Sequence, residues 1–325
     1  MTVTLRDGDF AYESLEYWET FPEGVSPVEC PGIAVDDKDD VFVLTRNVEY
    51  PIMVFAPDGT FKRSFGAGVF SDFAHGISIA PDGMIFCADV GNHAIRKFSP
   101  DGELLLTIGT PDQPAEIWSG EPFCRPTHVA VSPNSGDVFI TDGYGNSRVH
   151  KYSADGERIL SWGEPGIDPG QFVMPHNIVI DADERIYVAD RECLRVQIFD
   201  TDGQFITMWN NIYRPDGMTI GPDGLLYIAE LNTQGIEVPP PGVGHRISIW
   251  SLDGKQLARL GDPDMGEEAG KFIAPHGIAV DSKLDLYIGE VTYSVPEVGG
   301  RHQDPPREFK SLKKLKRLGA SGEAK

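Results

Sequence analysis

The chain has 325 residues, of which 40% are hydrophobic and 10% aromatic, so one large domain with a sizeable core is possible. Its formal net charge of −22 excludes broad binding to nucleic acid or anionic lipid, because both need clustered Lys and Arg. No stretch approaches the roughly 18 uninterrupted apolar residues that a membrane helix needs, so we expect neither nucleic acid nor membrane as a partner.

The amino terminus has acidic residues where a secretory signal would need a basic start and an apolar stretch. The four cysteines, Cys30, Cys87, Cys124 and Cys193, stand singly, as reduced thiols of a cytosolic protein do. These observations predict a cytoplasmic protein.

From residue 30 onward one pattern of strands and turns occurs six times. The first strand of each copy is expected at residues 30–35, 74–79, 126–131, 175–180, 215–220 and 275–280. The second strand follows at residues 41–46, 84–90, 138–144, 186–192, 226–231 and 286–291. Third strands ending in DG turns are clearest at residues 95–102, 149–156, 196–203 and 247–254. Fourth strands follow at residues 61–66, 104–109, 158–163, 205–210 and 256–261.

Four short strands per copy, separated by turn residues at a period of about 40 to 60 residues, are typical of propeller blades. Each four-stranded sheet has two apolar faces that only neighbouring blades can cover. The sequence therefore predicts an all-β fold, a six-bladed β-propeller.

The sixth copy lacks a clear fourth strand, while residues 15–24, LEYWETFPEG, read like the fourth strands of other copies. We expect a single domain over residues 1–325, in which an N-terminal strand at about residues 14–24 completes blade six. The tail from about residue 318 to 325 is expected to be flexible. The basic segment 309–318, FKSLKKLKRL, predicts an outer edge strand protected by lysines.

Three Pro- and Gly-rich insertions, at residues 109–124, 232–245 and 293–308, interrupt the spacing. They could form a rim or lid over one face, or be solvated decoration.

Three histidines occupy one repeat position. Aligned on the first strands, this position holds Pro31, His75, Thr127, His176, Asp216 and His276. Alternate blades of a six-bladed ring lie about 120° apart, so His75, His176 and His276 are expected to converge on the axis. Three imidazoles with an open fourth position are typical of catalytic zinc sites, although another divalent metal is possible. The alternative is that each His caps its strand through a hydrogen bond.

The ends of the second strands carry further candidates. The acids Asp89, Asp142, Asp190, Glu230 and Glu290 are interpreted as structural groups that bind the turns of their own blades. Arg46, Tyr144 and Arg191 follow second strands of blades one, three and four. An arginine beside a tyrosine near a divalent metal favours the ionised phenol, so that the tyrosine can act as a base.

The segments FCRPTHVAVSPNSGDVFITDGYGNSRVHKYS and QFVMPHNIVIDADERIYVADRECLRVQIFD resemble the peptidyl-α-hydroxyglycine lyase domain of peptidylglycine α-amidating enzymes. The repeats also resemble the NHL-repeat class. The resemblance implies a six-bladed propeller with zinc on His75, His176 and His276. It further implies that Tyr144 is the catalytic base and that Arg46 and Arg191 are active-site arginines.

By this resemblance the protein is a zinc-dependent carbon–nitrogen lyase of the peptidylamidoglycolate lyase type, which cleaves a carbinolamide to an amide and an aldehyde. Tyr144 would take the hydroxyl proton, and Arg46 would hold a carboxylate or the developing charge. No redox cofactor is needed. The family's structural calcium uses an aspartate where this chain has Gly277, which puts the calcium in doubt, and its DGYC cysteine is Gly145 here, which leaves Cys124 without that partner.

Because neither a monooxygenase domain nor a secretory signal accompanies the repeats, we expect a small-molecule substrate rather than a peptide hormone. Two alternatives remain: a metal-dependent hydrolase that opens a lactone or ester, and an NHL-type protein-interaction module. The oligomeric state is not predicted.

Overall fold

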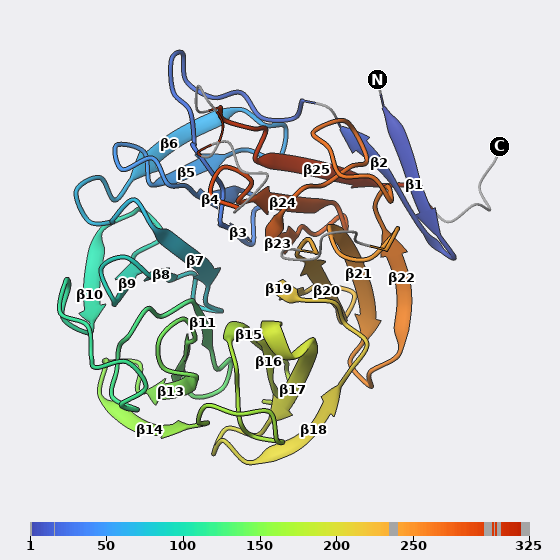
Figure 1. Ribbon diagram of the computed structural model, residues 1–325. Coiled ribbons are helices and arrows are strands. Elements are labelled where there is room, and N and C mark those ends of the chain that lie inside the picture. The colour runs from blue at the N-terminus through green and yellow to red at the C-terminus, as the bar shows by residue number, and fades with distance from the viewer. Residues whose placement is uncertain are drawn as a thin grey trace. The chain divides into compact units, whose positions relative to one another are not determined.

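The structure is a computed structural model that describes residues 2–15, 17–233, 240–295, 301, 303 and 307–319. Within these residues the chain forms 25 β-strands and one short 3-10 helix, η1 (Arg191–Cys193) (Figure 1). The strands form six sheets, which are the blades of a six-bladed β-propeller. The predicted fold class is confirmed.

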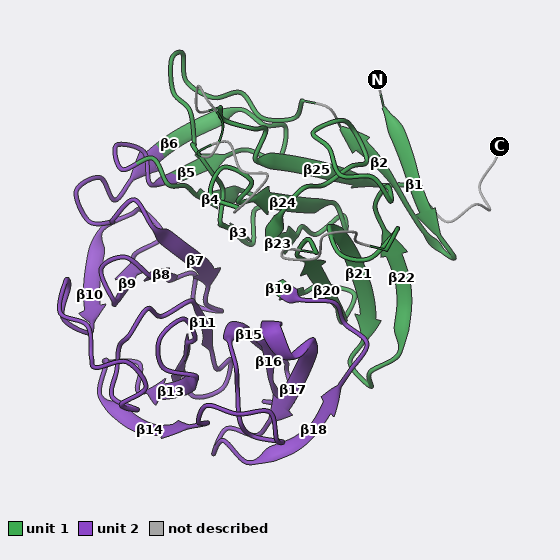
Figure 2. Cartoon of the chain, viewed as in Figure 1, with its two compact units in different colours: residues 1–47, 53–63, 216–325 green, residues 48–52, 64–215 purple. Residues whose placement is uncertain are grey.

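The chain divides into two compact units, which Figure 2 colours separately. Unit 1 holds blades one, five and six, and unit 2 holds blades two, three and four. The exceptions are residues 52, 64, 65 and 215, which lie in strands of blades one and five but belong to unit 2. Blade one comprises β3 (Gly32–Val35), β4 (Val41–Leu44), β5 (Ile52–Phe55) and β6 (Phe61–Phe65). Blade five comprises β19 (Pro215–Ile220), β20 (Leu225–Glu230), β21 (Arg246–Ser251) and β22 (Gln256–Leu260). Blade six comprises β23 (Pro275–Val280), β24 (Leu286–Glu290), β25 (Leu312–Arg317), β2 (Phe10–Leu15) and β1 (Val3–Asp7).

In unit 2, blade two comprises β7 (Ala74–Ile79), β8 (Ile85–Asp89), β9 (Ala94–Phe98) and β10 (Leu104–Ile108). Blade three comprises β11 (His128–Val131), β12 (Val138–Asp142), β13 (Arg148–Tyr152) and β14 (Arg158–Trp162). Blade four comprises β15 (Pro175–Ile180), β16 (Ile186–Asp190), β17 (Arg195–Phe199) and β18 (Phe205–Trp209). Consecutive strands within a blade pair antiparallel, as β9 does with β10, β11 with β12 and β16 with β17.

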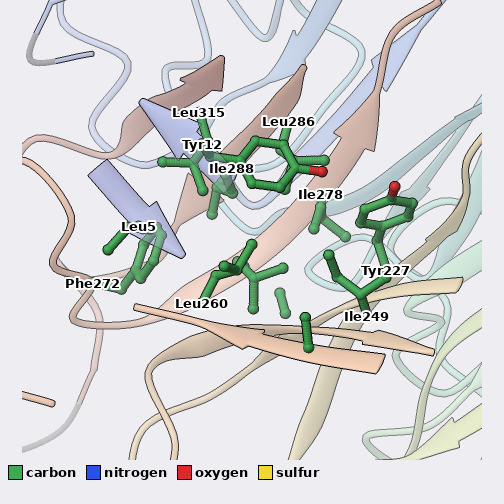
Figure 3. Close-up of a cluster of buried hydrophobic side chains, with 13 residues drawn as sticks. Leu5, Tyr12, Tyr227, Ile249, Leu260, Phe272, Ile278, Leu286, Ile288 and Leu315 are labelled. Carbon is green, nitrogen blue, oxygen red and sulfur yellow. The ribbon is translucent and has the colours of Figure 1, made fainter. Parts of the chain in front are cut away.

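Burial changes in a regular way across each blade. The second strands β8, β12, β16 and β24 are buried at every residue, whereas the outermost strands β10, β14 and β18 begin with exposed residues. A strand that is covered on both faces reads as a continuous apolar run, which accounts for the apolar sequences of the second strands. In unit 1, Leu5 and Tyr12 pack against side chains of β20 to β25 in one cluster (Figure 3).

Three of the acids at the ends of the second strands, Asp89, Asp190 and Glu290, bind the backbone of their own blades, as predicted. Asp190 accepts backbone N–H bonds from Val173 and Met174 at 3.1 and 3.0 Å. Asp89 and Glu290 accept equivalent bonds within blades two and six. Each acid therefore fixes the segment that enters its own blade's first strand.

The N-terminal strand closes blade six at a different place from the predicted one. β2 (Phe10–Leu15) pairs with β25, so the prediction of residues 14–24 was wrong in position. Trp18, which made that segment look like a fourth strand, instead packs on the rings of Tyr287 and Phe55, with centroids 4.9 and 5.9 Å away. The single domain over residues 1–325 stays a prediction.

The basic segment near the C-terminus is not an edge strand, contrary to prediction. β25 lies between β24 and β2, and Lys313 and Lys314 are buried. Lys313 pairs with Glu290 at 2.8 Å and Lys314 with Asp285 at 3.0 Å. The lysines therefore satisfy buried carboxylates instead of guarding an edge.

The insertion at residues 109–124 packs on blade three, where the backbone N–H of Trp118 donates to the Gly145 carbonyl at 2.8 Å. The other two predicted loops, 232–245 and 293–308, lie partly outside the described residues, and so does the predicted tail 318–325. No helix in the described part of the chain is long and apolar enough to span a membrane.

Candidate active site

The three predicted histidines share a local backbone feature. The strand register shifts by one residue across His75 in β7, across His176 in β15 and across His276 in β23. Such a β-bulge leaves one residue without a partner in the ladder and re-aims its side chain. The three histidines are therefore equivalent in backbone geometry as well as in their position within the repeat.

His75 and His176 both belong to unit 2, and each is 1% exposed. Their ring centroids lie 4.7 Å apart, and their ligand nitrogens lie within 4.8 Å of each other. Nδ1 of His75 lies 2.9 Å from the Thr127 carbonyl oxygen. Because a carbonyl only accepts, Nδ1 carries the proton and Nε2 presents a lone pair, as in a metal-binding imidazole.

Tyr144 follows β12 and meets both histidines. Its hydroxyl oxygen lies 3.1 Å from Nε2 of His75 and 3.0 Å from Nε2 of His176. A phenol has one proton, so it can donate to only one of these two nitrogens at a time. The hydroxyl thus lies within hydrogen-bonding distance of Nε2 of both histidines.

Arg191, the first residue of η1, lies against Tyr144. Its Nη1 donates to the Tyr144 hydroxyl oxygen at 3.3 Å, and the guanidinium carbon lies 5.5 Å from the ring centroid. Its Nη2 contacts the Met174 sulfur at 2.9 Å. Unit 2 therefore brings four of the six predicted site residues into one cluster: His75, His176, Tyr144 and Arg191.

Two charged residues of this cluster were not predicted. Glu192 Oε1 accepts from Arg191 Nε at 2.9 Å and from Arg214 Nη2 at 2.8 Å, so one carboxylate links two arginines. Burial alone would raise the pKa of Glu192, but Arg214 and Arg191 outweigh burial and hold that pKa below its ordinary value. Glu192 was visible in the ADRE motif, but nothing in the sequence pointed from it to Arg214, 22 positions further on.

Replacing Glu192 with glutamine is expected to lower the free energy of unfolding at pH 7 by about 1–2 kcal/mol, because two guanidinium groups lose their shared carboxylate. The folded-state pKa of Glu192 is lowered, so this stabilisation exists above the unfolded pKa of about 4.3 and is lost as pH falls through the folded value. Urea unfolding of both proteins at pH 7 and near pH 3 measures the difference, which should shrink at the lower pH.

The matched control is Glu121→Gln. Glu121 also pairs with an arginine, Arg158, but its side chain is 68% exposed. Exposed pairs contribute little, so this change should cost less than about 0.5 kcal/mol. Equal losses for the two variants would contradict a special role for the Glu192 link.

The remaining two predicted residues belong to unit 1. His276 is 5% exposed, and its Nδ1 donates to the Pro31 carbonyl oxygen at 2.6 Å, which again leaves Nε2 with a lone pair. Arg46 is buried and uses Nη1 to bind Glu29 and, at 2.7 Å, the Ser294 hydroxyl. Arg46 is thus ion-paired with a buried carboxylate of its own unit, which the sequence did not indicate.

His75, His176 and His276 are three buried imidazoles that could hold a metal ion. A calcium ligand next to the third histidine does not fit. A Cβ on Gly277 would lie 2.9 Å from the Pro31 carbonyl oxygen, so an aspartate could not replace Gly277 without a backbone shift.

His128 follows Thr127, the blade-three residue at the repeat position of the three histidines. Its ring packs against Gly76, where an added Cβ would lie 2.7 Å from the imidazole Cδ2. Burial, followed by the nearby His176, lowers the pKa of His128 to about 4, so its ring is neutral at physiological pH.

Cys124 is 3% exposed, and its sulfur occupies the position where a Cβ on Gly145 would project. Gly145→Cys is therefore expected to form a disulfide with Cys124 and raise the free energy of unfolding by about 1–3 kcal/mol, the lower part of the usual range because the backbone must shift slightly. Urea unfolding with and without reductant measures the gain.

The control is Gly145→Ser, which adds similar bulk without a thiol and should lower stability. Thiol titration of the denatured, unreduced Gly145→Cys protein should find three free thiols. Five would mean that the disulfide does not form.

The NHL repeat family model matches residues 123–152. NHL repeat-containing protein 3 from Homo sapiens is 32% identical over 279 residues, which cover 80% of this chain and 76% of that protein. Peptidyl-alpha-hydroxyglycine alpha-amidating lyase 1 from Drosophila melanogaster is 33% identical over 264 residues, which cover 75% of this chain and 47% of that protein. A streptogramin B lyase structure matches with a TM-score of 0.61 and 17% identity, covering 93% of this chain and 98% of the other, a likeness of fold alone.

Proposed function

The chain belongs to the family of NHL-repeat β-propellers that includes NHL repeat-containing protein 3, and we propose that it is a metal-dependent carbon–nitrogen lyase. The substrate class is a small carbinolamide, N–CH(OH)–R, and the products are an amide and an aldehyde. Similarity to the amidating lyases supports a lyase-type propeller, and the donors around Tyr144 support the particular reaction.

We assign the metal to His75, His176 and His276, with zinc as the first candidate. In support, His75 and His276 each give their Nδ1 proton to a backbone carbonyl, which leaves Nε2 available as a ligand. All three are bulge residues at one repeat position of alternate blades. When bound, a divalent metal would supply Lewis acidity toward the substrate's oxygen.

The observation that carries the proposal is the Tyr144 hydroxyl, which lies within 3.1 Å of Nε2 of both His75 and His176. Arg191 lies 3.3 Å from the same oxygen. A proton acceptor beside candidate metal ligands and a fixed cation suits the removal of a hydroxyl proton. A protein-binding surface would not need these groups together.

In the proposed reaction Tyr144 acts in its ionised form, which a bound divalent metal and Arg191 would favour, and accepts the proton of the substrate's hydroxyl. The C–O bond becomes C=O, the adjacent C–N bond breaks, and the departing amide nitrogen gains one proton, so no water is consumed. Arg191 stabilises negative charge at the reacting oxygen or a neighbouring carboxylate. Arg46 is a second candidate for the carboxylate, although its ion pair with Glu29 already occupies its Nη1.

The proposal is tested by incubating zinc-loaded protein with N-benzoyl-α-hydroxyglycine and measuring glyoxylate. N-Benzoylglycine, which lacks the hydroxyl, is the matched control and should release none. A δ-lactone assayed in parallel for acid formation distinguishes the alternative hydrolase. Acid from the lactone without glyoxylate would overturn the lyase proposal, and inactivity toward both would favour an interaction module. The cytoplasmic location stays a prediction.

A further inference from the structure

A pocket of about 440 Å³ lies in blade two, within unit 2 and apart from Tyr144 and its partners. Its wall is formed by the loop that precedes β7, by β9 and the turn before it, by the edge strand β10 and by the segment that follows β10. Arg96, Asn92, Val69, Leu104 and Asp112 are among the lining residues. The proposed reaction uses none of them.

Blade four shows what fills the equivalent space in another repeat. Arg195, on β17, pairs with Asp190 at 3.0 Å. Its two terminal nitrogens donate to the carbonyl oxygens of Ile167, Asp168 and Gln171 at 2.7, 3.2 and 2.8 Å. The loop before β15 thus places three peptide carbonyl oxygens within hydrogen-bonding distance of Arg195, which lies on the third strand of the same blade.

Blade two has an arginine at a different position of its third strand, and a shorter loop. Ala94 stands where blade four has Arg195, and Arg96 stands where blade four has Gln197, two positions later on the same face of the strand. The loop before β7 spans residues 66–73, eight residues against twelve, 163–174, in blade four. Among the described residues Arg96 makes one long hydrogen bond, from Nη2 to the Val69 carbonyl oxygen at 3.5 Å.

Two atoms at this pocket lack hydrogen-bond partners among the described residues: Nη1 of Arg96 and Oδ1 of Asn92. Both side chains are more than nine-tenths buried, Arg96 at 3% and Asn92 at 7% exposure. One atom is a donor and the other an acceptor, which is the complement of a secondary amide with its C=O and N–H. Unmet buried polar groups are costly, so a ligand that meets both is favoured.

We propose that this pocket binds a short extended peptide segment of a partner protein, whose amide group takes the place that the blade-four loop fills on Arg195. The unpartnered atoms have almost no exposed surface, so the side chains must turn toward the ligand. The hydrogen bonds that these side chains already make permit this movement. Nδ2 of Asn92 and Nη2 of Arg96 lie 3.3 and 3.5 Å from the Val69 carbonyl oxygen, and both distances are long for a hydrogen bond.

The surroundings favour a neutral amide over an anion. Asp112 lines the pocket, and buried Asp89 offsets part of the charge of Arg96. In blade four the arginine likewise binds neutral carbonyls while its carboxylate partner is in place. Leu104 is 43% exposed on the edge strand and offers a contact for one apolar side chain of the peptide.

The test uses N-acetyl-leucine N-methylamide as the probe, with two secondary amides and one apolar side chain. Titrated into the ¹⁵N-labelled full chain, it is expected to shift the amide resonances of residues 68–71 and 92–96, with a dissociation constant of roughly 1 mM for a ligand of this size. N-Acetyl-proline N,N-dimethylamide keeps the carbonyls without any N–H and should bind at least about tenfold more weakly. 4-Methylpentanoate tests the anion alternative.

Leu104→Asp should weaken probe binding about tenfold while leaving glyoxylate release unchanged. Leu105→Asp is the matched control: Leu105 is 48% exposed on the same strand but is not among the lining residues, so its substitution should leave binding intact. The proposal is overturned if the probe shifts no resonance at about 20 mM, if the N–H-free compound binds equally, or if the carboxylate binds more tightly.

Discussion

His176→Ala is expected to abolish tight metal retention and to weaken metal binding at least about 100-fold. Loss of a metal ligand lowers metal affinity more than loss of a group that only orients a ligand. The propeller should remain folded. His176 is one buried side chain in β15, and its loss leaves a cavity that costs about 1–3 kcal/mol. Metal analysis by mass spectrometry after dialysis, with thermal unfolding of the same samples, measures both quantities.

His93→Ala is the matched control for this experiment. His93 also belongs to unit 2, but its Nδ1 only accepts the backbone N–H of Arg125 at 3.1 Å, away from Tyr144. The His93→Ala protein and the wild-type protein should each retain about one equivalent of metal, whereas His75→Ala and His276→Ala should lose it. Retention by His176→Ala would disprove the assignment, and complete unfolding would show that the histidine is structural.

The blades could be predicted because their signals are local. A fully buried second strand is a short apolar run, and a DG turn needs a glycine that adopts a left-handed conformation. Gly203 illustrates the turn: its φ is 76°, and a Cβ there would lie 2.7 Å from the Trp162 ring. Such requirements appear in the sequence wherever the turn occurs.

The errors in blade six arose from contacts that are distant in the sequence. Lys313 and Lys314 looked like surface residues because Glu290 and Asp285, their partners, lie more than 20 positions away. Trp18 looked like the end of a fourth strand, yet it packs on Tyr287 and donates from its indole N–H to the Pro57 carbonyl at 2.9 Å. Burial of a charge or an aromatic ring depends on a partner that periodicity does not identify.

The candidate site was predictable only in part for the same reason. The histidine positions followed from the repeat, and Tyr144 and Arg191 followed from the family resemblance. The bulges that re-aim the histidines are set by strand register, which the sequence does not state. The pairing of Arg46 with Glu29 and of Glu192 with Arg214 joins charges on separate segments of the chain, so these links appear only in the folded protein.

Tyr144→Phe is expected to lower the rate of carbinolamide cleavage about 100-fold or more while metal binding persists, because the change removes only the proton acceptor. The phenyl ring keeps its place, since Arg191 and the two imidazoles contact its faces and edge as well as its oxygen. Turnover of N-benzoyl-α-hydroxyglycine by both metal-loaded proteins measures the effect.

Tyr152→Phe in the same blade is the control for Tyr144→Phe, since Tyr152 is a core residue 5% exposed and packed on Phe123. It should retain nearly full activity. If the turnover of Tyr144→Phe fell to that of the protein without metal, the phenol would also be needed to position His75 and His176. Its hydroxyl contacts Nε2 of these two histidines at 3.1 and 3.0 Å, which is consistent with such a role. If turnover were unchanged, Tyr144 would have no chemical role, and the proton would have to leave through a different group.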